Sequence, residues 1–352
     1  MQNGIYTADK VFTGDEWLNN AAIVVKDGYI TDLLPKHQLI VPANKHFNCL
    51  VPAFIDIQIY GADEKLFSVY QNVEAIDVLY QHCSNNKTQF FLPTIATNTK
   101  EVIVNCIDAI KQYWQIGGKG CLGLHIEGPW INAEKRGAHV RELIHQPNLD
   151  EVKELVSLGK GVIKMITLAP EVCSKAIIDY LLGENIIVSA GHSNANFEEA
   201  TASFNNGITT VTHLYNAMSS LQHRELGMVG ATFNHRSVMA SIIPDGFHVH
   251  FEAIKIAKKQ MQERLFVITD AVTTTTKGHY QHVLQANKYV CNQVLSGSAL
   301  TMPKAIYNLV NYCNIELNEA LRMCSFYPAK VLGLQNELGK IEKGFKAAIV
   351  EW

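Results

Sequence analysis

Four side chains that can bind metal ions or transfer protons lie at or near the ends of separate apolar runs. They are Glu127, His192, His213 and Asp270. A buried carboxylate is costly to desolvate unless a cation or hydrogen bonds meet it. Carboxylates and imidazoles suit zinc-like divalent ions, and three protein ligands plus water is the usual open catalytic arrangement. A single histidine in such a place is more often structural, so it is the combination that predicts a metal centre.

These residue types predict a hydrolytic reaction. A cation held by Glu127, His192 and His213 would lower the pKa of a bound water towards about 7. Asp270, beside that water, would accept its proton and hand it to a leaving group. The cation would also polarise a carbonyl. We therefore expect hydrolysis by metal-bound hydroxide, provided that the fold brings the four side chains together.

Eight short apolar runs alternate with helical stretches such as 72–86 and 250–261. The runs are 50–57, 89–94, 121–127, 162–169, 185–192, 208–214, 238–244 and 264–271. Apolar strands alternating with helices indicate a parallel sheet covered on both faces. Eight such units predict a closed α/β barrel of the (β/α)8 TIM type, in which the carboxyl ends of the strands share one mouth. An open doubly wound sheet is the alternative, but no G-x-G-x-x-G follows the first run.

The two ends of the chain have a different pattern. Residues 1–49 contain short strands, and Asp27-Gly28 between apolar segments predicts a hairpin. The tail 335–352 is again strand-like. We expect a small β domain formed by 1–49 and 335–352, shortened in its C-terminal part, and a metal-dependent catalytic barrel from 50 to 334.

Composition excludes several classes of function. The 352 residues carry a net charge of −3, so no basic footprint for nucleic acid is present. No apolar run has the length of a membrane span, and the N-terminus lacks the pattern of a signal peptide. The 8 cysteines form no C-x-x-C pair, which favours buried thiols and a reduced cytoplasmic setting.

Several motifs together resemble the N-acetylglucosamine-6-phosphate deacetylases of the amidohydrolase superfamily. They are "PAFIDIQIYG", "LGLHIEGPW", "TLAPE", "VSAGHSNA", "THLYNAMS", "DGFHV", "VITDA" and "LSGSALTM", in order between residues 51 and 302. The resemblance implies a (β/α)8 barrel with a small β-sandwich built from both termini. It also implies hydrolytic removal of acetate from N-acetyl-D-glucosamine 6-phosphate, in amino-sugar catabolism and recycling.

The resemblance also implies residue roles. Glu127, His192 and His213 would bind the metal, Asp270 would be general base and acid, and His139 would hold the acetyl oxygen as it becomes an oxyanion. The substrate-binding set would be Ala138, His139, Asn216, Ala217, Arg224, His248, Leu295, Ser296 and Gly297. Arg224 and His248 would bind phosphate, in the neighbouring subunit of a homodimer.

Gln58 and Tyr60 stand where many superfamily members have H-x-H. This departure implies one divalent ion per subunit. Zinc is the expected ion, and iron, manganese, cobalt or nickel would suit the same ligands. Asp56 and Gln58 are expected to support the site by hydrogen bonding.

Other histidines have simpler interpretations. We expect His125 to pack beside the site, His250 to start a helix, and His279 and His282 to be solvated. The loop 273–282 is either a lid or an ordinary loop. Two other functions stay open: an amidohydrolase for another N-acyl amino sugar or a cyclic amide, and an inactive sugar-phosphate-binding protein, although the intact Asp270 argues against the latter.

Overall fold

The computed structural model describes residues 1–352, and eight parallel strands form its central sheet. In spatial order they are β5 (Phe54–Ile59), β8 (Thr88–Ala96), β9 (Leu124–Glu127), β10 (Ile163–Leu168), β11 (Ile187–Ala190), β12 (Thr210–Val211), β13 (Met239–Ile242) and β14 (Leu265–Val267). The two edges of this sheet meet, because Tyr60 N donates to Ala271 O at 2.8 Å and Asp270 N donates to Gln58 O at 3.0 Å. The predicted (β/α)8 barrel is confirmed.

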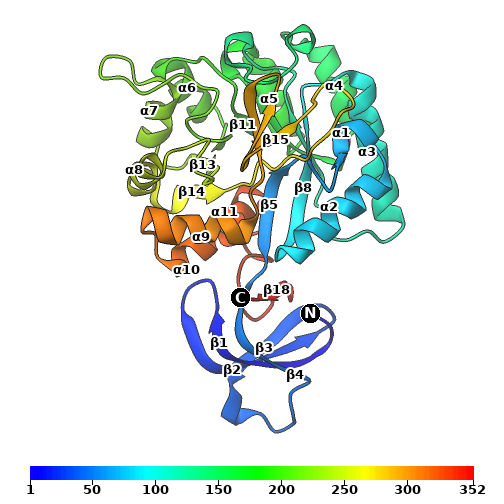
Figure 1. The fold of residues 1–352 in the computed structure, drawn as a ribbon, viewed down its shortest axis with the longest axis vertical. Coiled ribbons are helices and arrows are strands. Elements are labelled where there is room, and N and C mark those ends of the chain that lie inside the picture. Colours follow the sequence, from blue (N-terminus) through cyan, green and yellow to red (C-terminus); the bar gives the residue numbers. More distant parts are fainter.

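Helices cover the outside of the barrel (Figure 1). They are α1 (Phe67–Tyr70), α2 (Val73–Asn85), α3 (Lys100–Gln115), α4 (Leu149–Leu158), α5 (Lys175–Gly183), α6 (Phe197–Asn205), α7 (Gly227–Asn234), α8 (Phe251–Met261), α9 (Met302–Cys313), α10 (Leu317–Cys324) and α11 (Phe326–Val331). The predicted helices 72–86 and 250–261 are α2 and α8. The side chain of His250 accepts from Glu252 N and caps α8, so its expected helix-start role is confirmed.

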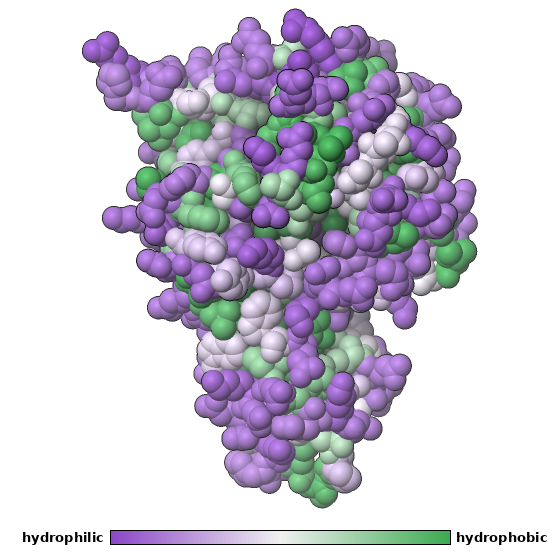
Figure 2. All heavy atoms as spheres, viewed as in Figure 1, coloured by the Kyte–Doolittle hydropathy of each residue, from purple (hydrophilic) through white to green (hydrophobic).

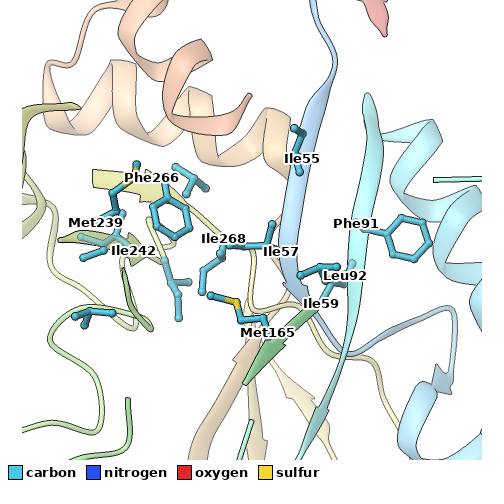
Figure 3. Packing of buried hydrophobic residues seen from close by; sticks show 14 of the residues in the cluster. Ile55, Ile57, Ile59, Phe91, Leu92, Met165, Met239, Ile242, Phe266 and Ile268 are labelled. Atoms are coloured by element: carbon cyan, nitrogen blue, oxygen red, sulfur yellow. The ribbon is translucent and has the colours of Figure 1, made fainter. Parts of the chain in front are cut away.

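Apolar side chains fill the space between strands and helices. Figure 3 shows Ile57, Met165 and Ile268 pointing towards one another from separate segments. His125 is buried among the strands, where its Nδ1 pairs with Ile57 O at 3.0 Å and its Nε2 with Thr167 Oγ1 at 2.8 Å. Both ring nitrogens are therefore occupied, which confirms that His125 packs beside the site and is not a ligand. The cysteines are all unpaired thiols, and seven of the eight are buried.

A second sheet lies at one end of the barrel and contains both ends of the chain (Figure 1). Its order is β18 (Ile349–Glu351), β4 (Lys45–Pro52), β1 (Gly4–Phe12), β2 (Trp17–Lys26) and β3 (Tyr29–Pro35). Asp27 and Gly28 form the predicted hairpin turn with φ angles of 52° and 80°, as the tight turn of type I′ requires. The expected boundary after residue 49 falls within β4, which reaches Pro52 before β5 begins.

A small three-stranded sheet stands beside the barrel mouth. It consists of β15 (Val283–Gln285), β16 (Lys288–Cys291) and β17 (Val294–Ser298). In Figure 2 most of the visible face is hydrophilic, and apolar side chains gather where Figure 1 places β15. The remaining short elements are β6 (Gly61–Ala62), β7 (Lys65–Leu66), η1 (Lys36–Gln38), η2 (Ala133–Lys135), η3 (Arg141–Leu143), η4 (Pro170–Val172) and η5 (Gln262–Arg264). None of the helices is both long and apolar enough to span a membrane.

Candidate metal centre and substrate pocket

The four expected side chains lie at the carboxyl ends of four barrel strands. Glu127 is the last residue of β9, and His192, His213 and Asp270 follow β11, β12 and β14 within three residues. The latter three have φ angles of 47°, 37° and 54°. This left-handed region is uncommon for residues other than glycine, and such residues cluster at functional sites. The backbone therefore turns sharply at each strand end, and the side chains meet at the mouth.

Three donor atoms converge on one point. His213 Nε2 lies 3.1 Å from Glu127 Oε1 and 3.1 Å from His192 Nε2, and His192 Nε2 lies 3.4 Å from Glu127 Oε1. A tetrahedral ion with ligand bonds of about 2.1 Å separates its ligands by about 3.4 Å. All three side chains are buried. Their donor types and spacing therefore fit one zinc-like divalent ion.

His139 also reaches this cluster, with its Nε2 3.2 Å from Glu127 Oε2. By proximity alone, Glu127, His139 and His192 form a possible metal-binding group. The hydrogen bonds distinguish the two histidines. His139 Nδ1 accepts from Thr97 N at 3.3 Å, so the proton is on Nε2 and points at Glu127. His192 Nδ1 instead faces the carbonyl of Lys135 at 2.8 Å, which leaves Nε2 free to bind a cation.

Burial keeps His139 uncharged: it lowers the pKa of this histidine to about 4, with the nearby His192 acting in the same direction. His139 is therefore arranged as a neutral hydrogen-bond donor. His213 differs, because its Nδ1 is buried without a partner and its Nε2 faces the cluster. The geometry favours His213 over His139 as the third ligand beside Glu127 and His192.

Asp270 is held next to the donor atoms by Gln58. Gln58 Nε2 donates to Asp270 Oδ1 at 2.8 Å and lies 3.0 Å from Glu127 Oε1. Burial, together with the negative charge of Glu127, raises the pKa of Asp270 well above its usual value. This environment therefore favours the neutral, protonated form of the carboxyl group. Asp56 is buried and accepts a hydrogen bond at its Oδ2 from Thr269 Oγ1 at 2.5 Å. Burial raises the pKa of Asp56 to about 7.

Tyr60 fills the side of Glu127 that faces away from His192 and His213. Its hydroxyl donates to Glu127 Oε2 at 2.5 Å and accepts from Gln58 Nε2 at 2.8 Å. The two carboxylate oxygens of Glu127 thus have different partners: Oε1 faces His192, His213 and the Gln58 amide, and Oε2 faces Tyr60 and His139. The expectation of a single ion per subunit stays a prediction.

A pocket opens above these residues. The expected site residues that line it are Glu127, Ala138, His139, His192, His213, Asn216, Ala217, His248, Asp270, Leu295, Ser296 and Gly297. Residues that the sequence reasoning did not assign to it are Tyr60, Leu66, Ser68, Ala96, Gly137, Ile243, Val272, Tyr280 and His282. Gly297 has a φ of 68°, and a Cβ there would lie 2.3 Å from Val272 Cγ1, so only glycine fits this wall.

The two expected phosphate-binding residues lie in different places. His248 lines the pocket of its own chain, with its Nδ1 2.7 Å from Asp245 Oδ2. The expectation that His248 serves a neighbouring subunit stays a prediction, because the structure describes a single chain. Arg224 lies on an exposed loop and does not line this pocket.

The expectation that His282 is solvated is wrong. Its side chain is 3% exposed, its Nε2 lies 3.0 Å from Ser296 Oγ, and burial lowers its pKa to about 4. Tyr280 is also buried, and its hydroxyl donates to Thr97 O at 2.6 Å. His279, next to Tyr280, is exposed as expected. Tyr280 and His282 are two residues apart, and in an extended segment such residues point to the same face. This spacing was the sequence signal that could have indicated that both side chains are buried on one face.

Fold and donor atoms together define a metal-dependent hydrolase built on a (β/α)8 barrel. The model of the amidohydrolase family matches residues 49–352, and the chain belongs to this family.

Named relatives are similar over nearly the full length. The N-acetylglucosamine-6-phosphate deacetylase of Haemophilus influenzae is 32% identical, and the alignment covers 95% of this chain and 91% of the relative. The N-acetylgalactosamine-6-phosphate deacetylase of Escherichia coli O157:H7 is 29% identical, with 98% and 94% covered. The crystal structure of the N-acetylglucosamine-6-phosphate deacetylase from Pasteurella multocida has a TM-score of 0.92 at 30% identity, covering 98% of this chain and 94% of that one.

Proposed function

We propose that this protein hydrolyses the acetamide of N-acetyl-D-glucosamine 6-phosphate, releasing acetate and glucosamine 6-phosphate. The observation that carries the proposal is the meeting of Glu127, His192 and His213 beside Asp270 on the floor of one pocket. Relatives named for this activity support it, at 32% identity for Haemophilus influenzae. A relative named for the galactosamine substrate is nearly as similar, at 29% identity. The two sugars differ in whether one hydroxyl is equatorial or axial, so the preference between these two substrates must be tested.

One divalent ion, zinc by preference, would be held by Glu127, His192 and His213, where it would polarise the acetyl carbonyl and acidify water. Asp270 Oδ1 accepts from Gln58, which leaves Oδ2 to take a proton from the attacking water. Asp270 then returns that proton to the amine nitrogen as the C–N bond breaks.

His139 supplies a donor for the developing oxyanion. Its Nε2–H faces Glu127 Oε2 at 3.2 Å, and its ring is kept neutral by burial. We propose that this N–H turns from Glu127 to the acetyl oxygen when substrate binds, where a neutral donor stabilises new negative charge. The sugar would lie between Asn216 and Ala217 on one side and the segment Leu295, Ser296 and Gly297 on the other, since both line the pocket.

The phosphate would be bound at the edge of the pocket. His248 lies there, and its contact with Asp245 orients the ring so that Nε2 is directed away from that carboxylate. The chain has a net charge of −3, so an anionic substrate needs local cations. We propose that a second copy supplies Arg224 in a homodimer, because Arg224 is exposed and outside its own pocket.

The first test compares four substrates with one purified protein. Acetate release should be fastest from N-acetylglucosamine 6-phosphate. For the unphosphorylated sugar, kcat/KM should be lower by about 100-fold or more, since each hydrogen bond to a charged group contributes about 1.5–3 kcal/mol and about 1.4 kcal/mol is tenfold. N-acetylgalactosamine 6-phosphate and a cyclic amide complete the set. Bound metal is counted per chain in the same preparation.

Each alternative function has its own outcome in this test. Equal rates with and without phosphate would remove the phosphate argument, and preference for the cyclic amide would indicate a different amidohydrolase activity. Metal binding and phosphosugar binding without acetate release would favour an inactive binding protein.

The proposed dimer can be tested by mixing inactive variants. Arg224→Ala and Asp270→Asn each disable one part of a shared site. If Arg224 acts in the neighbouring subunit, refolding the two variants together should produce mixed dimers with one intact site, and activity should rise to about a quarter of the wild-type value, as random pairing predicts. Mixtures that stay as inactive as the separate variants would contradict the shared site.

A further inference from the structure

We propose that Glu171 is a positioning residue for the metal centre and fixes the geometry of His192. This inference rests on the metal-binding role proposed above for His192. Glu171 lies in η4, directly after β10, and does not line the pocket. It has no lysine or arginine partner among the ion pairs of the structure. Its carboxylate instead accepts hydrogen bonds from uncharged donors.

Those donors come from the loops on both sides of Glu171. Oε1 accepts from Asn132 Nδ2 at 3.0 Å and from Asn194 N at 2.6 Å. Oε2 accepts from Ser193 Oγ at 2.6 Å. Asn132 belongs to the loop after β9, and Ser193 and Asn194 belong to the loop after β11. One side chain therefore joins three consecutive loops at the barrel mouth.

The joined loops are the ones that hold His192. Asn132 N donates to His192 O at 2.9 Å, and the same loop provides Lys135 O to His192 Nδ1 at 2.8 Å. Ser193 and Asn194 directly follow His192, whose φ of 47° needs support from its surroundings. Glu171 thus fixes the backbone after His192 and also the loop whose carbonyl sets the protonation of its ring. Without Glu171, we expect Nε2 of His192 to move away from the position at which His192 and His213 would bind the same ion.

The chain offers variants that separate hydrogen bonding from charge. In Glu171→Gln the amide oxygen can accept from Asn132 and Asn194, and its NH2 can donate to Ser193 Oγ, because a hydroxyl is donor or acceptor. Glu171→Ala loses all three contacts. Glu134→Ala is the matched control, since Glu134 is a carboxylate outside the pocket lining that also contacts Asn194, through Nδ2 at 3.2 Å.

The experiment measures Zn²⁺ dissociation constants by chelator competition and the absorption spectrum of the Co²⁺-substituted proteins. Glu171→Ala should bind Zn²⁺ about 10–100-fold more weakly than wild type, the range for lost supporting contacts around metal ligands. Its Co²⁺ spectrum should also change. Glu171→Gln and Glu134→Ala should stay within a few-fold of wild type, with an unchanged spectrum.

Wild-type affinity and spectrum in a folded Glu171→Ala would overturn the inference while leaving the proposed metal site intact. Weakening in Glu171→Gln as large as in Glu171→Ala would also overturn it, because charge and not positioning would then be decisive. If Glu171→Ala does not fold, Ser193→Ala removes the Oε2 contact, together with the bond from Ala195 N to Ser193 Oγ at 3.1 Å, and must weaken Zn²⁺ binding. Wild-type affinity in Ser193→Ala rejects the proposal. A wild-type protein that binds no Zn²⁺ would reject the proposed metal site itself.

Discussion

Replacing Asp270 by asparagine should lower kcat for acetate release by about 10²–10⁴-fold while the bound metal stays at one ion per chain. The introduced asparagine can still accept from Gln58 Nε2 through its amide oxygen, so the wild-type contact at 2.8 Å can persist. It cannot take a proton from water or return one to the amine. Activity and metal content are measured on the same preparation, so that loss of chemistry is distinguished from loss of the ion.

Asp108→Asn is a suitable control, since Asp108 is an exposed carboxylate on α3 that pairs with Lys111 at 3.3 Å and does not line the pocket. It should leave kcat and metal content unchanged. An Asp270→Asn protein with near-normal turnover would show that another group carries the proton. Loss of the metal from this variant would instead indicate that Asp270 is a ligand.

Replacing Glu127 by glutamine should remove the metal and with it nearly all activity. Glu127 Oε1 lies within 3.4 Å of both His192 Nε2 and His213 Nε2, and it is the carboxylate oxygen that completes the donor set. A neutral amide is a much poorer ligand for a divalent ion, so affinity should fall by more than the roughly 100-fold typical of lost supporting contacts. Metal content after dialysis and acetate release are the two measurements.

The Glu127→Gln chain should still fold, because it can keep the contact of its side chain with the Tyr60 hydroxyl, 2.5 Å from Oε2 in the wild type. A circular dichroism spectrum equal to that of wild type checks this. Glu142→Gln, on the exposed surface, is the control for loss of one negative charge. Retention of a full complement of metal by Glu127→Gln would show that the Glu127 carboxylate is not needed as a ligand.

Residues at strand ends were predictable from sequence because position along the chain decides their place in space. In a closed parallel barrel every strand ends at the same mouth, so the strand pattern alone brings Glu127, His192, His213 and Asp270 together. Their hydrogen-bonding environment was not predictable in this way. The proton positions on His139 and His192 depend on Thr97 N and on Lys135 O, which belong to other loops.

Residues outside the strand ends were harder to predict. His282 lies in the polar segment "TTTTKGHYQH", which has no local feature of burial; its contact with Ser296 forms only when β17 packs beside the mouth. Glu171 has no charged partner and no spacing pattern, although it is part of "TLAPE". The roles of such residues follow from their contacts in the folded protein, and tertiary packing determines those contacts.

The pairing of β18 with β4 also constrains the order in which the molecule can assemble. Val350 lies opposite Val51, and Trp352 packs edge-on against Phe54 with ring centroids 5.8 Å apart. These partners are separated by almost the whole chain, and contacts between distant residues carry a large loop-closure cost. Synthesis must therefore proceed past residue 351 before β18 can pair with β4, and until then the edge of β4 is open to pairing with other chains.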